Sequence, residues 1–251
     1  MTRERHVPLE GTFNLRDVGG YSAAAGTTRW RKLYRSDSLH QLSPQDRAEL
    51  ADRGISLVID LRDDQERAAF PSSLDGLAVR VEHNPVFSTP ASAFIAIDAR
   101  LDDLYDDVIT RSGDRLVSAV KLIADSGDDA VLVHCTAGKD RTGLVIALTL
   151  IAAGVDRSSV IEDYAQTEKH LPAALLDAIV ERLRAEHVPD SVNLDELVRQ
   201  SPAVALERIL GRLDSEYGSV TGFLVEHGLT DDELKRLRSV LVTDGEKEAG
   251  P

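Results

Sequence analysis

The stretch Val131-Leu-Val-His-Cys-Thr-Ala-Gly-Lys-Asp-Arg-Thr-Gly143 decides the fold of this chain. Residues 130–133 are apolar and rich in valine, which is typical of a short buried strand. Residues 144–153 (Leu-Val-Ile-Ala-Leu-Thr-Leu-Ile-Ala-Ala) would form a helix that is apolar on nearly every side, as a core helix is. We therefore predict a buried strand, a tight loop and a buried helix in succession.

The loop between them carries Cys135 and, six positions later, Arg141. A loop that leads directly into a helix leaves backbone N–H groups unpaired, and together with the helix dipole these form an anion site. Gly138 allows the backbone to approach an oxyanion closely, and Arg141 can donate two hydrogen bonds to phosphate oxygens. Because the same positive environment stabilises a thiolate, we expect Cys135 to be a nucleophile.

The pattern His-Cys-x-x-Gly-x-x-Arg-Thr of residues 134–142 resembles the signature loop of the cysteine-dependent protein tyrosine phosphatase superfamily. Its longer form is similar to a bacterial branch of tyrosine/lipid phosphatases. Asn14-Leu-Arg-Asp-Val-Gly-Gly20 and Val58-Ile-Asp-Leu-Arg62 match that branch too, so the resemblance covers roughly the first two thirds of the chain. A Walker A loop is excluded, because Val133 and Asp140 stand where it requires Gly and Ser or Thr.

The resemblance implies hydrolysis of phosphomonoesters through a phosphocysteine, with no metal and no organic cofactor. The Thr142 hydroxyl is expected to donate a hydrogen bond to the cysteine sulfur. His134 is expected to point away from the phosphate and to brace the loop. The predicted phosphate-binding residues are Thr136, Ala137, Gly138, Lys139, Asp140 and Arg141.

Asp140 is the candidate general acid, because a thiolate and a phosphate nearby favour the protonated form of a carboxyl group. The family resemblance supports this role, since the branch carries its acid inside the loop. Three alternative acids are Asp60, Asp63 and Asp64, although the last two also suit a helix N-terminus. An ion pair between Asp140 and an arginine is the structural alternative.

Four further residues are expected to support the site. Arg16 is predicted either at the rim of the phosphate site or, with Asp17, in a structural salt bridge. Arg62 follows a predicted buried strand, where an active-site rim is expected. Lys139 is either a second cation for a multiply charged head group, such as that of a phosphoinositide, or a surface lysine.

The composition narrows the class of partner. The chain has 251 residues, 42% of them hydrophobic, and a net charge of −14, which repels nucleic acid and anionic membranes at long range. Its single cysteine excludes an internal disulfide. Residues 1–6 are polar and the run 144–155 is shorter than the roughly 20 residues of a membrane span. We expect a cytoplasmic protein without stable membrane insertion, although export without a recognisable signal occurs in the resembled family.

We predict an α/β fold like that of protein tyrosine phosphatases, with a mostly parallel sheet of four or five strands flanked by helices and a helical C-terminal third. Strands are expected at 29–36, 55–61, 77–82 and 130–133. Residues 1–243 are predicted to form a single phosphatase domain, with 165–200 as a candidate helical lid and 244–251 as a disordered tail. The predicted C-terminal helices are 160–170, 172–186, 202–217, 220–227 and 231–242.

The predicted activity is that of a phosphatase acting on phosphotyrosine, with phosphoserine, phosphothreonine and phosphoinositides left open as substrates. A phosphate-binding module without turnover is the main alternative from another class. A sulfur transferase or an arsenate reductase would use the same Cys-x5-Arg loop, but such enzymes usually lack the Arg-Thr-Gly continuation. Nothing in the sequence indicates the oligomeric state.

Overall fold

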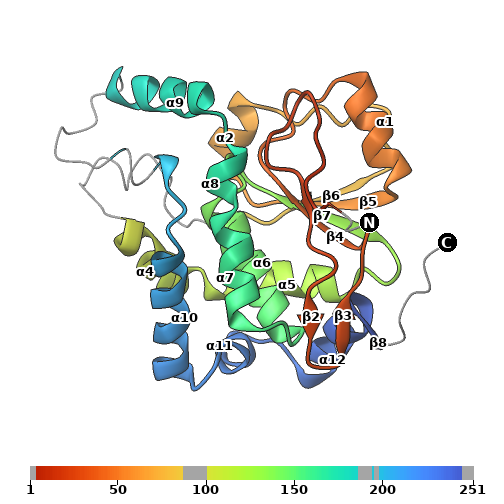
Figure 1. The fold of residues 1–251 in the computed structure, drawn as a ribbon, viewed down its shortest axis with the longest axis vertical. Helices are drawn as coiled ribbons and strands as arrows, with labels where there is room; N and C mark the ends of the chain where they lie inside the picture. The colour runs from red at the N-terminus through yellow and green to blue at the C-terminus, as the bar shows by residue number, and fades with distance from the viewer. Residues whose placement is uncertain (1–3, 87–100, 186–193, 195–197, 245–251) are drawn as a thin grey trace.

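The computed structural model describes residues 4–86, 101–185, 194 and 198–244 (Figure 1). Its larger sheet has five strands in the order β1-β4-β7-β5-β6. The last four are parallel to one another, and β1 is antiparallel to β4. The predicted mostly parallel sheet is thus confirmed. The strands are β1 (Arg16–Asp17), β4 (Leu33–Ser36), β7 (Ala130–His134), β5 (Ile55–Asp60) and β6 (Arg80–His83).

Helices cover both faces of this sheet (Figure 1). On one face α1 (Pro44–Asp52) packs against β5, while on the other α6 (Asp140–Ala152) packs against β4 and β7, with α5 (Gly113–Ala124) beside it. The buried side chains alternate along the strands, so that Val131 and Val133 belong to one core cluster and Leu132 to the other. The strand predicted at 130–133 is therefore buried on both faces.

The described residues of the C-terminal third are mainly helical, as predicted. The expected helix at 160–170 is divided at Gln166 into two helices. Of the candidate lid, residues 186–193 and 195–197 lie outside the described part. The remaining helices are α2 (Asp64–Ala69), α4 (Leu101–Arg111), α7 (Arg157–Ala165), α8 (Thr167–His170), α9 (Ala173–Ala185), α10 (Ala203–Tyr217), α11 (Val220–Glu226) and α12 (Asp231–Leu241).

A second, three-stranded antiparallel sheet is not predicted by the sequence. It consists of β2 (Ser22–Ala23), β3 (Gly26–Thr28) and β8 (Val242–Asp244). Strands of two or three residues are too short to show an alternating pattern, and β8 comes from a charged segment. The prediction that the disordered tail begins at residue 244 is wrong, because Asp244 pairs with Gly26. Residues 245–251 lie outside the described part.

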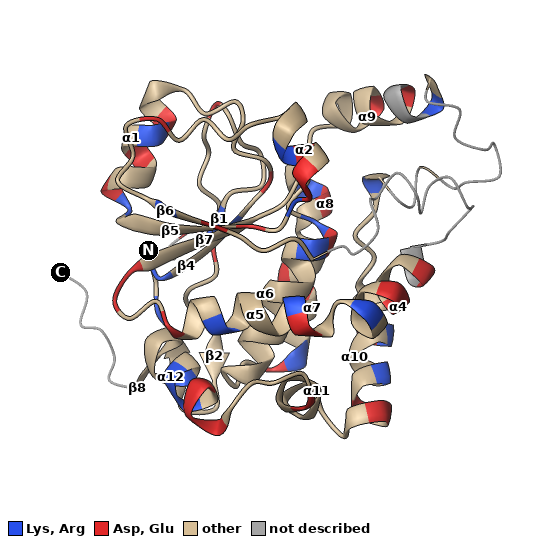
Figure 2. Cartoon of the chain, turned by 180° about the vertical axis from the view of Figure 1, so that it is seen from behind, with Lys and Arg blue, Asp and Glu red and all other residues tan. Residues whose placement is uncertain are grey.

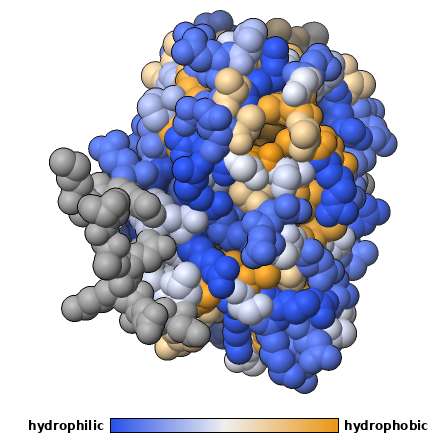
Figure 3. Space-filling view, turned by 90° about the vertical axis from the view of Figure 1, so that its right-hand side faces the viewer, coloured by the Kyte–Doolittle hydropathy of each residue, from blue (hydrophilic) through white to orange (hydrophobic). Residues whose placement is uncertain are grey.

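The charged residues are not concentrated in one element, because Figure 2 shows acidic and basic residues together on α1, α2 and α10. The face in Figure 3 is mainly hydrophilic, with an apolar area within it. Among the described residues, no helix combines the length and the apolar character that crossing a membrane requires.

Candidate active site

The signature loop joins the C-terminal end of β7 to the first turn of α6, as the sequence predicts. Cys135 is 2% exposed, and Arg141 is also buried. Gly138 has φ +64°, and a Cβ atom there would lie 2.4 Å from the Ser36 carbonyl oxygen. The loop therefore packs so tightly against the end of β4 that only glycine fits at this position.

Two side chains hold the loop from behind through its carbonyl groups. Asn14 Nδ2 donates to the carbonyl oxygens of Ala137 and Gly138, both at 3.2 Å, and Arg35 Nη2 donates to that of Gly138 at 2.8 Å. In a trans peptide the N–H group points opposite to the carbonyl group of the preceding residue. The N–H groups of Gly138 and Lys139 consequently point away from Asn14 and Arg35, as an anion site requires.

Arg16 lies among the side chains behind the signature loop and not at the rim of the phosphate site. Its side chain is fully buried, with Nε 3.7 Å from Asp163 Oδ1, and Arg35 Nη1 lies 2.6 Å from Asp163 Oδ2. Burial and then the charge of Arg35 lower the pKa of Arg16 to about 10. Burial opposes ionisation of Asp163, but the two arginines hold its pKa below the usual value. The predicted salt bridge of Arg16 exists, but its partner is Asp163 and not Asp17.

Asp17 stabilises the turn after β1. Its carboxylate accepts hydrogen bonds from the backbone N–H groups of Gly19 at 2.8 Å and Arg31 at 2.7 Å. None of its hydrogen bonds to the described residues reaches the signature loop. The expectation that Asp17 supports the phosphate site directly is therefore corrected, because its carboxylate is used by the backbone of that turn.

Glu66 is a site residue that sequence reasoning missed. From α2 it accepts hydrogen bonds from Arg141 Nη1 at 2.5 Å and Nη2 at 2.7 Å, and from the Thr136 hydroxyl at 2.5 Å. Burial alone would raise the pKa of Glu66, but the hydrogen bonds from Arg141 lower it to about 2. The spacing Asp63-x-x-Glu66 signals the capping box at the start of α2, but gives no sign of the distant arginine.

Asp60, the last residue of β5, and Arg62, just after the strand, bind each other. Arg62 is buried and bound to Asp60 by Nε to Oδ1 at 2.9 Å and Nη2 to Oδ2 at 2.7 Å. Burial alone would raise the pKa of Asp60, but its pairing with Arg62 lowers that pKa, so Asp60 is a poor proton donor. Arg62 is therefore not an open rim residue, because its guanidinium group is already occupied. Asp63 caps α2, and the Asp64 side chain is 90% exposed, as their helix-start alternative predicts.

His134 braces the loop from the core, as expected. Its ring is fully buried, with Nδ1 3.2 Å from the Cys135 carbonyl oxygen and Nε2 3.6 Å from Asp60 Oδ2. Burial lowers the pKa of His134 to about 4, so the ring is neutral near pH 7. The predicted hydrogen bond from Thr142 to the cysteine sulfur does not form, because the Thr142 hydroxyl is buried in the first turn of α6 without a hydrogen-bond partner among the described residues.

Lys139 is not a surface lysine, so that alternative is corrected, and its role as a second cation for the substrate stays a prediction. It is 2% exposed, and its Nζ donates to the Gln200 carbonyl oxygen at 2.9 Å and lies 3.6 Å from Asp140 Oδ1. Asp140 Oδ1 also accepts a hydrogen bond from the Tyr105 hydroxyl at 2.7 Å. Among the described residues no ion pair joins Asp140 to an arginine, so the structural alternative for Asp140 is not found there.

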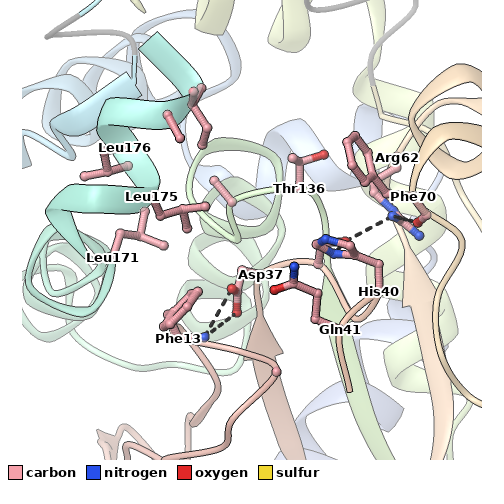
Figure 4. Close-up of a pocket in the computed structure, with 15 residues that line it drawn as sticks. Phe13, Asp37, His40, Gln41, Arg62, Phe70, Thr136, Leu171, Leu175 and Leu176 are labelled. Carbon is pink, nitrogen blue, oxygen red and sulfur yellow. Dashed lines mark hydrogen bonds between the residues drawn. The ribbon is translucent and has the colours of Figure 1, made fainter. Parts of the chain in front are cut away.

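A cavity of about 330 Å³ adjoins the loop at Thr136 and Ala137. Figure 4 shows Leu171, Leu175 and Leu176 on one side, facing Phe70 across the space. His40, Gln41 and Arg62 lie on the same side as Phe70, while Phe13 and Asp37 lie below, between Leu171 and Gln41. Within the described part of the chain, no group of three or more His, Cys, Asp or Glu side chains could hold a metal ion.

The family model described as "Tyrosine phosphatase family" matches residues 7–243. The chain belongs to the tyrosine phosphatase family. Within this family it is 31% identical over 274 residues to the "Triple specificity protein phosphatase PtpB" of Mycobacterium tuberculosis, covering 93% of this chain and 98% of that one. A "Tyrosine-protein phosphatase" of Nostoc commune is 30% identical, covering 81% of this chain and 72% of that one. The crystal structure of P. aeruginosa TpbA is 21% identical, covers 70% of this chain and 94% of that one, and has a TM-score of 0.38.

Proposed function

We propose that this chain is a protein-tyrosine phosphatase whose nucleophile is Cys135. The observation that carries the proposal is the placement of Cys135 and Arg141 at the two ends of one loop, with Gly138 held from behind by Asn14 and Arg35. This arrangement provides backbone donors and a guanidinium group for three phosphate oxygens. The names of the relatives, one a tyrosine-protein phosphatase and one a triple specificity phosphatase, support it.

In the proposed first step the Cys135 sulfur attacks phosphorus, and the bond from phosphorus to the ester oxygen breaks. Asp140 gives its proton to that oxygen as the alcohol or phenol leaves. In the second step water attacks phosphorus, Asp140 takes a proton from it, and the bond from phosphorus to sulfur breaks. Phosphate and the free thiolate result, so that the protein returns to its starting state. Neither step needs a metal or an organic cofactor.

The cavity beside the loop supports phosphotyrosine as the main substrate. Its apolar side chains suit a phenyl ring, and they include Phe13, Leu171 and Leu175. We propose that α8 and α9, the described helices of the candidate lid, cover this ring. A phosphoinositide head group would need further cations at the loop, but the Lys139 amine is engaged by Gln200 and Asp140. Phosphotyrosine is therefore favoured over phosphoinositide as the substrate. We propose that residues 1–243 form a single phosphatase domain.

The deciding experiment is hydrolysis of p-nitrophenyl phosphate in the presence of a metal chelator, with inhibition by vanadate. We expect wild-type turnover and its complete loss in Cys135→Ser. Phosphate binding without turnover would instead indicate a non-catalytic module. A panel of phosphotyrosyl, phosphoseryl and phosphothreonyl peptides and phosphoinositides would then rank the substrates. A Leu175→Asp variant, which places a charge in the proposed ring pocket, should lose activity mainly on the phosphotyrosyl peptides.

A further inference from the structure

Two buried tyrosines form a chain of hydrogen bonds that ends on Asp140. The hydroxyl of Tyr105, in α4, donates to Asp140 Oδ1 at 2.7 Å, and the hydroxyls of Tyr105 and Tyr164, in α7, are hydrogen-bonded to each other. Both rings are at most 1% exposed. A carboxylate can only accept, so Tyr105 donates to Asp140 and Tyr164 donates to Tyr105.

Both hydroxyls keep their protons throughout the neutral range. Burial first, and then the charge of Asp140, raises the pKa of Tyr105 well above its ordinary value. Burial raises the pKa of Tyr164 in the same direction. The two tyrosines therefore remain hydrogen-bond donors whether Asp140 is protonated or ionised.

The contacts of Asp140 distinguish its two carboxyl oxygens. Tyr105 donates to Oδ1, and Lys139 Nζ lies 3.6 Å from the same atom. A donor and a cation stabilise negative charge on Oδ1, which leaves Oδ2 as the oxygen that carries the proton. A carboxyl group with assigned oxygens presents its proton in one direction, as transfer to a leaving oxygen requires.

The last glycine of the signature makes this arrangement possible. A Cβ atom on Gly143 would lie 2.8 Å from Tyr164 Cδ2 and 2.9 Å from Cε2. The ring of Tyr164 thus lies directly against the first turns of α6, and from there its hydroxyl reaches Tyr105. Any larger residue at 143 would displace the tyrosine ring.

We propose that Tyr105, supported by Tyr164, is a positioning residue that holds Asp140 Oδ1 as an acceptor and leaves Oδ2 to protonate the leaving group. The inference rests on the proposed function, in which Asp140 is the general acid. Neither tyrosine touches the reacting atoms in this proposal, and each acts only through Asp140.

The test is Tyr105→Phe, which keeps the ring and removes the donor. We expect roughly a tenfold loss of kcat on phenyl and alkyl phosphates, whose leaving groups need a proton, and less than about twofold on p-nitrophenyl phosphate. Loss of the donor also destabilises ionised Asp140, so the basic limb of kcat on phenyl phosphate should move up by about one pH unit. Equal losses on all substrates with an unmoved limb would overturn the proposal.

Tyr164→Phe provides a second variant, which also serves if Tyr105→Phe does not fold. We expect the same leaving-group dependence with a smaller loss, about threefold, because the effect passes through Tyr105. In the double variant the Tyr164 substitution should add less than about twofold, since its hydroxyl acts only through that of Tyr105. If the losses of kcat from the two substitutions are additive, the proposal that Tyr164 acts through Tyr105 is overturned.

Controls separate this inference from the proposed function. Tyr34→Phe alters an equally buried tyrosine in the other core cluster and should leave the kinetics unchanged. Asp140→Asn must show a larger leaving-group dependence than Tyr105→Phe. If Asp140→Asn shows none, the acid assignment fails; if it does but Tyr105→Phe does not, only the positioning role fails. Activity that survives Cys135→Ser would reject the phosphocysteine itself.

Discussion

Glu66 binds the end of the Arg141 guanidinium group with both carboxylate oxygens, at 2.5 Å from Nη1 and 2.7 Å from Nη2. The edge formed by Nε and Nη2 is the one with which a guanidinium group can bind two phosphate oxygens, and Nη2 of Arg141 also donates to the Thr136 hydroxyl oxygen at 3.5 Å. Glu66 thus fixes the plane of Arg141. A buried arginine on a long side chain would otherwise lose much conformational entropy when phosphate binds.

Glu66→Gln should lower kcat/KM roughly 10- to 100-fold, because the amide has only one acceptor oxygen and its NH2 group would face a guanidinium N–H, so that Arg141 would lose its fixed plane. The matched control is Asp64→Asn on the same helix, whose side chain is 90% exposed and which should change kcat/KM less than about twofold. Steady-state kinetics on p-nitrophenyl phosphate measure both. Tighter inhibition by phosphate in Glu66→Gln would show instead that Glu66 competes with the substrate.

Stability should fall as the pH drops from about 6.5 to 4. The folded pKa of His134 is about 4 against an ordinary 6.5, so within this window the unfolded chain binds more protons than the folded chain. The full loss attributable to His134 is about 3 kcal/mol, and it is complete only below pH 4. Urea unfolding between pH 7.5 and 4.5 measures it.

His134→Asn should reduce that pH dependence and leave the part due to His170, because burial also lowers the pKa of His170 to about 4. His83→Gln is the control, since the His83 side chain is 27% exposed and lies at the end of β6. The control should keep the wild-type slope. An unchanged slope in His134→Asn would show that His134 does not contribute to the pH dependence.

Asp163→Asn should destabilise the fold by about 3–5 kcal/mol, because it leaves two buried arginines without their carboxylate. Asp214→Asn breaks an ion pair of 2.5 Å with Arg157 in which both side chains are more than 40% exposed, and should cost about 1 kcal/mol or less. Denaturant unfolding curves give both values. Similar costs would mean that Asp163 is not the counterion of Arg16 and Arg35.

Gly138→Ala should abolish activity, while Gly54→Ala should leave it intact. Both glycines have positive φ, +64° and +74°, so alanine is strained by about 1 kcal/mol at either position. Only at Gly138 would the Cβ atom collide, at 2.4 Å from the Ser36 oxygen, whereas nothing lies within 4 Å at Gly54. Turnover together with thermal stability separates the two effects. An active Gly138→Ala enzyme would contradict the tight packing of the loop.

The parts of the molecule that the sequence predicts correctly are those with local causes. Residues 130–133 are apolar in succession, which is enough to indicate a strand buried on both faces. The helix start at Asp63 follows from residue types within one turn. The signature loop is equally local, since its nucleophile and its arginine lie within seven residues.

The parts that the sequence does not predict depend on partners distant along the chain. Glu66 and Arg141 are 75 residues apart, and nothing in either segment refers to the other. Tyr105 and Asp140, whose carboxylate accepts the hydrogen bond of the tyrosine hydroxyl, are 35 residues apart. A lysine in a loop is usually mobile, and only the contact with Gln200 shows that Lys139 is held.

The smaller sheet links the order of synthesis to the order of folding. Gly26–Thr28 pairs with Val242–Asp244, and Arg29 N–H donates to the Leu241 carbonyl oxygen. During translation, β3 therefore cannot pair with β8 until more than 200 further residues have been synthesised. By then the loop with Cys135 has long been made, so a nascent chain carries its nucleophile well before the strand that closes this sheet leaves the exit tunnel.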